Sequence, residues 1–257
     1  MLRLKIMDIL IWAYSLISVF AVSIISLIGV LFLSVKQAKL QGILLYLVSF
    51  AAGALFGDTF IHLLHEAFNK MADNFFLPLY VLSGIFLFFV VEKVIRWRHC
   101  HILEHKQHYH PLAAINLIGD GIHNFIDGIL IGASFAVSLP LGLATSLAVI
   151  LHEIPHEIGN FAVLVHAGLP VKKALLYNFL SALTAILGTV LALLIGQRVA
   201  GFSLLMVPLA AGGFIYIAGS DLIPELHHDQ GLANSLKQFL ALLLGVGVML
   251  ALLLLEA

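Results

Sequence analysis

Eight long apolar segments restrict the folds open to this chain. A transmembrane helix needs about 20 mostly apolar residues, and we expect such helices at approximately 8–34, 42–66, 75–96, 112–137, 141–167, 171–195, 202–225 and 233–255. Hydrophobic residues make up 61% of the chain and charged residues 11%, whereas soluble domains are about 25% charged. Because a soluble fold could not bury this much apolar surface, the sequence predicts an all-α, polytopic membrane protein with eight transmembrane helices.

The connectors between these segments are short, so we expect one transmembrane domain that covers residues 1–257. The distinctive connector is the loop of residues 97–111, which is rich in histidine. The apolar run of residues 6–35 is too long for the apolar core of a signal peptide. We therefore interpret it as a retained first span.

Basic residues predict the orientation, because cytoplasmic loops carry an excess of Lys and Arg. If the N-terminus is outside, nine basic residues face the cytoplasm and four face the other side. The nine are Lys36, Lys39, Lys93, Arg96, Arg98, Lys106, Lys172, Lys173 and Lys237, and the four are Arg3, Lys5, Lys70 and Arg198. We expect an integral, multi-pass protein of the cell membrane (inner or plasma), with both termini extracytoplasmic and the His-rich loop in the cytoplasm.

The composition also excludes several kinds of site. A net charge of −1 gives no support for nucleic-acid binding. Cys100 is the only cysteine, which excludes a disulfide framework and a metal site built from thiolates. The ATP-binding pattern G-x-x-x-x-G-K-[ST] does not occur.

Ionisable residues at membrane depth gather on the fourth and fifth predicted spans. Each costs on the order of 2.5–3.5 kcal/mol on insertion scales, so such residues indicate function. On the fourth span, helical spacing places five polar residues in one stripe: Asn116, Asp120, His123, Asn124 and Asp127. Within that stripe His123 and Asp127 are one turn apart and can share a metal ion.

The fifth predicted span carries two parallel rows of polar side chains. His152, His156 and Asn160 follow one another at a spacing of four, and Glu153 and Glu157 form the row beside them. Imidazole, carboxylate and amide ligands suit Zn²⁺, Fe²⁺ or Mn²⁺ and argue against Cu⁺. The two spans predict a metal site in the helix bundle, because a network that only joins helices needs fewer polar groups.

The polar set offers enough ligands for two neighbouring metal ions. One ion would be held by His123, Asp127, His152 and His156, and its neighbour by Asn124, Asp127, Glu153 and His156.

The two motifs resemble a known family. His123-Asn-Phe-Ile-Asp-Gly128 and His152-Glu-Ile-Pro-His-Glu157 are similar to the paired metal motifs of the ZIP (Zrt/Irt-like) transporters, the second in the form of the LIV-1 branch. The resemblance covers nearly the whole chain, which looks like a minimal eight-span core. It implies that the chain is a transporter and not an enzyme. The transporter would move Zn²⁺, or Fe²⁺, Mn²⁺ or Cd²⁺, toward the cytoplasm without a cofactor. It also implies a binuclear site with Asp127 and His156 as bridging ligands, and its metal ligands would be His123, Asn124, Asp127, His152, Glu153 and His156.

Other polar residues match the family less sharply. A secondary metal or pathway role would fall to Asp58, His62, Asp120, Glu157, Asn178, Asp221 and Glu225. For Asp58 and His62 of the second span, and for Asp221 and Glu225 of the seventh, a role in gating or in helix contacts is an equal alternative. The loop histidines would bind metal loosely, or serve only in a connector: His99, His101, His105, His108 and His110.

An intramembrane zinc metalloprotease is the alternative function. His152-Glu153-Ile-Pro-His156 satisfies H-E-x-x-H, which supplies two zinc ligands and a Glu general base in metalloproteases. Pro155 between the two histidines, and the second ligand-rich span before them, count against that interpretation.

Small residues on the spans allow helices to approach closely. Ala51-Ala-Gly-Ala54 and Ala210-Ala-Gly-Gly213 would serve such contacts inside the chain or in a homodimer. The expected partners are therefore divalent metal ions, the lipid bilayer and a second copy of the chain.

Overall fold

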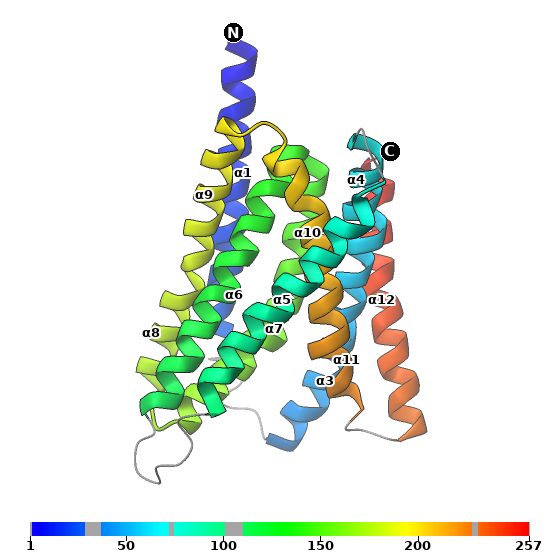
Figure 1. The fold of residues 1–257 in the computed structure, drawn as a ribbon. Coiled ribbons are helices and arrows are strands. Elements are labelled where there is room, and N and C mark those ends of the chain that lie inside the picture. Colours follow the sequence, from blue (N-terminus) through cyan, green and yellow to red (C-terminus); the bar gives the residue numbers. More distant parts are fainter. Residues whose placement is uncertain (1, 29–36, 72–74, 101–109, 228–230, 257) are drawn as a thin grey trace.

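The computed structural model describes residues 2–28, 37–71, 75–100, 110–227 and 231–256. Within these ranges the regular elements are helices and no strand occurs, which confirms the all-helical prediction. The helices run side by side, broadly along one axis (Figure 1). They are α1 (Leu2–Ile25), α3 (Gln37–Gly57), α4 (Leu64–Lys70), α5 (Leu77–Cys100), α6 (His110–Val137), α7 (Leu139–His166), α8 (Val171–Ala182), α9 (Thr184–Arg198), α10 (Phe202–Tyr216), α11 (Ile223–Leu226) and α12 (Leu232–Glu256).

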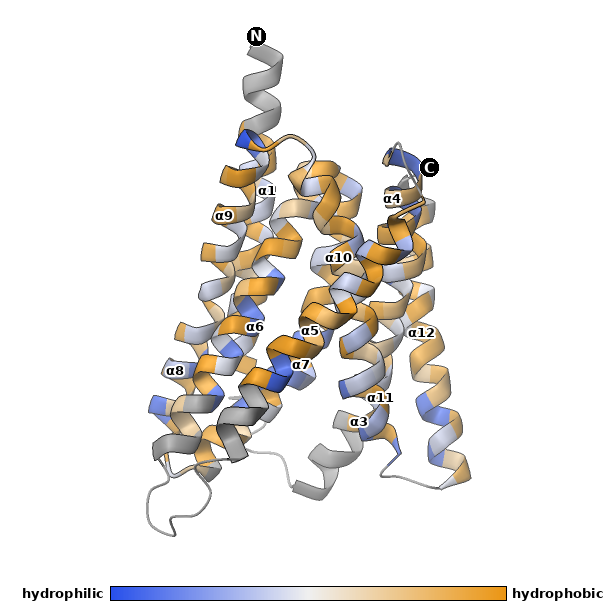
Figure 2. Cartoon of the chain, viewed as in Figure 1, coloured by the Kyte–Doolittle hydropathy of each residue, from blue (hydrophilic) through white to orange (hydrophobic). Residues whose placement is uncertain are grey.

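Six helical segments are long and apolar enough to cross a membrane. They cover Ile9–Ile28, Leu45–Lys70, Leu77–Val94, Val171–Arg198, Phe202–Leu226 and Leu232–Leu253. The two other long helices, α6 and α7, have 28 residues each and carry the polar residues singled out in the sequence. Figure 2 shows these hydrophilic positions on helices that are otherwise largely hydrophobic. The structure thus supports a multi-pass membrane protein with six candidate spans, and crossing by α6 and α7 stays a prediction.

Three of the spans are interrupted. Asp58–Leu63 and Ile217–Leu222 form wider π-helical turns, η2 and η3, between α3 and α4 and between α10 and α11. Leu183 separates α8 from α9. Such irregular turns are frequent at functional positions, and hydropathy alone did not predict them.

A single residue joins α6 and α7, the two helices that carry the polar residues of the fourth and fifth predicted spans. Ser138 follows α6 in an extended conformation, and its side chain accepts a hydrogen bond from the backbone N–H of Leu141 at 3.3 Å. Serine is a favoured residue at the start of a helix, and Pro140 in the first turn supplies a helical φ angle. The short turn makes α6 and α7 an antiparallel pair, so their polar faces can meet.

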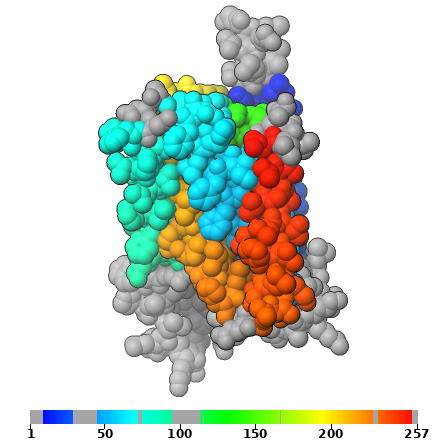
Figure 3. Space-filling model, turned by 90° about the vertical axis from the view of Figure 1, so that its right-hand side faces the viewer, coloured from blue at the N-terminus to red at the C-terminus, as the bar shows by residue number. Residues whose placement is uncertain are grey.

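The helices pack in two groups. The first contains α1, α6, α7, α8 and α9, and the second contains α3, α4, α5, α10, α11 and α12 (Figure 1). In Figure 3, α12 and α3 of the second group lie side by side along one face.

Small residues make the closest contacts inside the second group. A Cβ added to Gly53 would lie 2.0 Å from the carbonyl oxygen of Leu242 in α12. One added to Gly212 would lie 2.1 Å from the carbonyl oxygen of Val81 in α5. Both small-residue stretches noted in the sequence therefore serve helix packing within the chain.

Candidate metal centre

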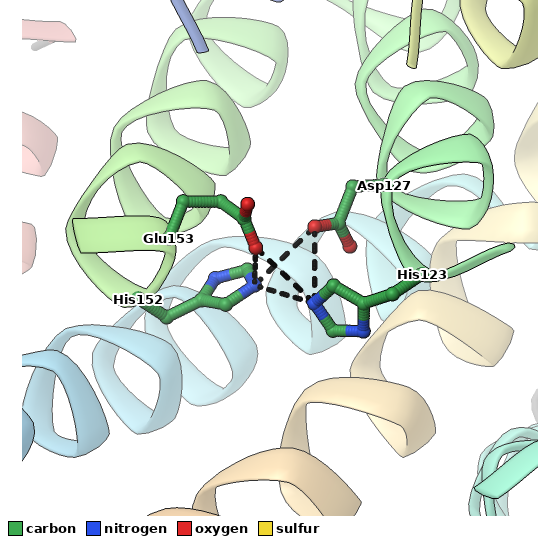
Figure 4. Close-up of side chains that lie close together, drawn as sticks. All are labelled: His123, Asp127, His152 and Glu153. Atoms are coloured by element: carbon green, nitrogen blue, oxygen red, sulfur yellow. Dashed lines mark hydrogen bonds and ion pairs between the residues drawn. The ribbon is translucent and has the colours of Figure 1, made fainter. Parts of the chain in front are cut away.

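Four side chains from α6 and α7 converge between these helices. His123 and Asp127 come from α6, and His152 and Glu153 come from α7 (Figure 4). One ligand atom from each lies within 4.8 Å of the other three. Asp127, His152 and Glu153 are buried, and 20% of the His123 side chain is exposed. The helical turn between His123 and Asp127, and the adjacency of His152 and Glu153, place all four at one level.

The spacing of the four atoms suits a small metal ion. Nε2 of His123 lies 3.5 Å from Oδ2 of Asp127, 3.2 Å from Oε1 of Glu153 and 3.4 Å from Nε2 of His152. Nε2 of His152 lies 3.3 Å from the same Asp127 and Glu153 oxygens. Ligands 2.0–2.1 Å from Zn²⁺ in a tetrahedron are separated by about 3.3–3.4 Å. The distances therefore match a tetrahedral ligand set.

Apart from the imidazoles of the cluster, its carboxylates have no hydrogen-bond donor among the described residues. The oxygens of Asp127 and Glu153 are buried, and the nitrogens that face them are those of the cluster histidines, at 3.2–3.5 Å. Buried carboxylates are costly unless they are hydrogen-bonded, paired with a cation or bound to a metal. A divalent cation between them would offset that cost, so the residues present are suited to hold one.

His152 is held in an orientation suited to a metal ligand. Its Nδ1 lies 3.2 Å from the carbonyl oxygen of Ala148 on the same helix. Because a carbonyl only accepts hydrogen bonds, Nδ1 carries the proton and Nε2 presents its lone pair to the cluster. Metal-binding histidines commonly use the second ring nitrogen in this way.

His156 lies at the edge of the cluster, and Asn124 is bonded to Asp120 on the same helix. Nδ1 of His156 is 3.4 Å from Oε1 of Glu153, and its ring centroid lies 4.3 Å from that of His123. Asn124 is buried and donates from Nδ2 to Asp120, which leaves its Oδ1 without a hydrogen-bond partner. Oε1 of Glu153 lies 3.2–3.4 Å from a ring nitrogen of His123, His152 and His156. The sequence predicted Glu153 as a ligand but did not indicate this central position.

A second polar set lies beside the cluster, between α6, α7 and α8. The Asp120 carboxylate accepts hydrogen bonds from Asn124, Asn160 and Ser181. Donors to Asp120 therefore come from all three helices. The sequence placed Asn160 only in the polar row with His152 and His156, and the structure gives it the role of an amide donor.

Glu157 and Asn178 are a hydrogen-bonded pair within this second set. The Asn178 amide donates to Oε2 of Glu157 and, at 3.1 Å, to the backbone carbonyl of Ser26. Both side chains are buried. They face the α8 side of the interface, whereas His152 and Glu153 face α6.

The second-span residues lie away from the four-residue cluster. Asp58 and His62 are buried in η2, and Nε2 of His62 lies 3.0 Å from the backbone carbonyl of Met249 in α12. This contact is within the second helix group. For His62, the helix-contact alternative therefore has a specific partner.

A cavity of about 570 Å³ reaches the cluster from the end of the bundle where α5 ends and α6 begins. His123, His152 and His156 line it on one side. Asp221 and Glu225 of the seventh predicted span line the opposite side.

Glu92 and Tyr216 in the cavity wall were not predicted. The Tyr216 hydroxyl donates to Oε2 of Glu92 and joins α10 to α5. Glu92 lies close to the predicted end of the third span, where an acidic residue is ordinary, so the sequence contained no signal for this role. The histidines of the loop fall largely outside the described residues: 101–109 are not described, and His99 and His110 lie at helix ends.

Comparison with known proteins adds independent information. Residues 9–111 and 98–253 match the family described as ZIP zinc transporter. The chain is similar to zinc transporter zipt-7.1 of Caenorhabditis briggsae, with 31% identity over 307 residues that cover 93% of this chain and 78% of that protein. It is 30% identical over 288 residues to metal cation symporter ZIP14 of Xenopus tropicalis, which covers 84% of this chain and 62% of that protein.

A third relative matches a shorter region. Zinc transporter ZIP10 of Mus musculus is 42% identical over 154 residues, which cover 56% of this chain and 18% of that protein. The chain therefore spans most of the worm relative and less than a fifth of the mouse relative.

Proposed function

The chain belongs to the ZIP zinc transporter family, and we propose that it carries divalent metal ions across a membrane through the cluster of His123, Asp127, His152 and Glu153. The observation that carries this proposal is the convergence of four buried or half-buried ligand atoms, with five of their six separations at 3.2–3.5 Å, as in a tetrahedral zinc site. Zn²⁺ is the preferred cargo, because the set combines two imidazoles with two carboxylates. Fe²⁺, Mn²⁺ and Cd²⁺ are further candidate cargoes. The family is one of transporters, and the protease alternative has no support.

Asn124 and His156 complete the proposed ligand set. The position of His156 beside Glu153 suits a second ion or a transient step as metal leaves the four-residue cluster, and Asn124, which donates to Asp120, would supply its amide oxygen. Ligands must be deprotonated to bind metal, so binding competes with protons. Several overlapping ligand sets keep binding favourable yet reversible, which transport requires.

We also propose eight membrane crossings, with both termini extracytoplasmic. The helices α6 and α7 have 28 residues each, enough to span a bilayer. The α1 end at Leu2 and the α12 end at Glu256 lie at the same end of the bundle, as an even number of crossings requires (Figure 1). The cavity at the cluster then opens to the cytoplasm, the direction in which metal would be released.

Alternating access would use the two groups of helices. Rocking of one bundle against another is the common way to expose a central site to each side in turn. The metal cluster lies wholly within α6 and α7 of the first group, and the acidic residues Asp221 and Glu225 belong to the second. A relative movement of the groups would change the access without taking the cluster apart. A homodimer stays a prediction.

Transport of zinc is the direct test. Liposomes that contain the purified chain and a zinc-sensitive dye should brighten when Zn²⁺ is added outside, faster than protein-free liposomes. If there is no flux above protein-free liposomes, and a helical substrate is cleaved in a manner that depends on Glu153, the protease interpretation would replace ours.

The acidic wall of the cavity should affect the rate of transport without being essential. Neutralising Asp221 and Glu225 together (Asp221→Asn with Glu225→Gln) removes two negative charges from the wall opposite the cluster. Because the cavity lies on the proposed release side, its acidic wall attracts the cation away from the cluster, and we expect zinc flux at low ionic strength to fall about 3- to 10-fold without it. Flux at 0.5 M salt should differ less, since salt screens the field.

A matched control is Glu66→Gln, since Glu66 is paired with Lys70 at 2.8 Å and does not line the cavity. Equal losses in the double variant and in Glu66→Gln would contradict a role for the cavity charges.

A further inference from the structure

We infer that Asp120 is a positioning residue of the metal centre, which fixes α6, α7 and α8 relative to one another and is not itself a metal ligand. This inference rests on the proposed function of the cluster. Asp120 lies on α6 three residues before His123, and 3% of it is exposed. Its side chain accepts hydrogen bonds from residues of three successive predicted spans, the fourth, fifth and sixth.

Both carboxylate oxygens of Asp120 are already occupied by protein donors. Oδ1 accepts from Nδ2 of Asn124 at 3.2 Å and from Nδ2 of Asn160, and Oδ2 accepts from the hydroxyl of Ser181. The carboxylates of Asp127 and Glu153 are faced by imidazole nitrogens at 3.2–3.5 Å and have no other donor among the described residues. Asp120 is therefore satisfied by amide and hydroxyl donors, whereas Asp127 and Glu153 are grouped with the histidines of the cluster.

The side-chain amide of Asn160 supplies the hydrogen bond that joins Asp120 to α7. Nδ2 of Asn160 reaches Oδ1 of Asp120 across the α6–α7 interface. The Nδ1 atom of His156 lies 3.9 Å from the same oxygen, which is too far for a hydrogen bond. Asn160 thus ties α7 to α6 one turn after His156, and it does so with a donor that cannot titrate.

Asp120 also bonds to the segment where α8 ends and α9 begins. The hydroxyl of Ser181, three residues before Thr184, donates its one proton to Asp120. Thr184, just beyond the break at Leu183, donates to the carbonyl of Gly121 at 2.6 Å. The broken sixth span is therefore held to two successive residues of α6, Asp120 and Gly121.

These bonds matter for the metal because its ligands come from two helices. His123 and Asp127 move with α6, whereas His152 and Glu153 move with α7. A displacement of one helix along the other by about 1 Å would spoil the tetrahedral spacing. Asp120, which bonds α7 and α8 from a position beside His123, opposes that displacement.

The test compares the metal site in the unmodified chain and in Asp120→Asn, with Co²⁺ as a spectroscopic probe. Four-coordinate Co²⁺ absorbs visible light more strongly than six-coordinate Co²⁺, so the spectrum reports ligand geometry. Replacing residues that orient metal ligands typically costs 10- to 100-fold in affinity. We expect Asp120→Asn to weaken Co²⁺ binding about 10- to 100-fold and to reduce the visible absorption, with the number of ions bound at saturation unchanged.

A swap distinguishes positioning from ligation. The double variant Asp120→Asn with Asn160→Asp exchanges amide and carboxylate and keeps a hydrogen bond between α6 and α7. It should restore most of the Co²⁺ affinity and spectrum. Ser146→Ala is the control, because Ser146 is a buried α7 residue whose hydroxyl bonds only to Gly142 of its own helix. It should leave both readouts unchanged.

Three results would overturn the inference: loss of one bound ion in Asp120→Asn, no rescue by the swap, or an unaltered spectrum. If Asp120→Asn fails to fold, Asn160→Ala removes one donor and leaves the Ser181 bond, and it should weaken Co²⁺ binding by a smaller factor. An unaltered spectrum in Asn160→Ala would count equally against the role. Failure of zinc flux in the unmodified chain would overturn the proposed transport and leave these equilibrium measurements valid for Asp120.

Discussion

Replacing Asp127 or His152 with alanine should abolish zinc uptake into liposomes while leaving a folded protein in the membrane. Each residue is buried, and each supplies one of the four ligand atoms of the cluster. Changes to residues that only orient ligands cost about 10- to 100-fold in affinity, so the loss of a direct ligand should exceed 100-fold. Removing a buried carboxylate that has no amide, hydroxyl or backbone donor also relieves a desolvation cost, so Asp127→Ala should not lower the thermal stability of the metal-free protein.

Two measurements check this expectation. Zinc flux is recorded in liposomes, and the melting temperature is recorded in detergent with and without Zn²⁺. In the unmodified chain Zn²⁺ should raise the melting temperature, because a ligand that binds the folded state stabilises it. In both variants that shift should vanish.

The control for the cluster is Thr145→Ala, which removes a buried hydroxyl from α7 two turns before His152. It should keep both the flux and the shift in melting temperature. Flux like that of the unmodified chain in both Asp127→Ala and His152→Ala would remove the cluster from the transport path.

The pairing of His123 with Asp127, two of the proposed ligands, followed from spacing alone. An α-helix brings residues four apart to one face, which predicted that His123 and Asp127 lie together. Hydropathy and spacing likewise predicted that the polar faces of the fourth and fifth spans would be turned inward, because polar groups at membrane depth avoid lipid. Local rules of this kind require no knowledge of the remaining helices.

What the sequence could not supply depends on contacts between distant segments. The role of Asp120 required Asn160 and Ser181, which lie on other helices and are ordinary polar residues in the sequence. His62 lies one turn from Asp58 in the sequence, yet it contacts the Met249 carbonyl of α12 and not the cluster. Its direction depends on the π-helical turn, which no local composition reveals.

The division into two packed groups also emerged only in three dimensions. Glycines were visible in the sequence as small residues, but their partners were not. In the first group, a Cβ added to Gly188 of α9 would lie 2.0 Å from the carbonyl oxygen of Phe125 in α6. The contact places α9 directly behind the helix that carries His123 and Asp127, so close packing and the position of the ligands are linked.

Gly128→Ala should therefore destabilise the protein and disturb the metal centre together. A Cβ at Gly128 would lie 1.9 Å from the carbonyl oxygen of Ala185 and 2.6 Å from its carbonyl carbon, both backbone atoms of α9. Backbone cannot rotate aside as a side chain can, so α6 and α9 must separate. Overpacking of this kind costs about 1–3 kcal/mol and occasionally more. Because Gly128 follows Asp127 directly, the displaced segment of α6 carries a ligand with it.

The comparison is with Gly121→Ala on the same helix. There the nearest atom to an added Cβ is Cγ2 of Thr184 at 3.7 Å, an ordinary contact. Alanine is the better helix former by about 1 kcal/mol in water, so Gly121→Ala should keep or slightly raise the melting temperature. Gly128→Ala should lower it by several degrees and weaken the stabilisation by Zn²⁺. Equal melting temperatures in the two variants would mean that α6 and α9 are not in backbone contact, and the close packing behind the ligands would have to be abandoned.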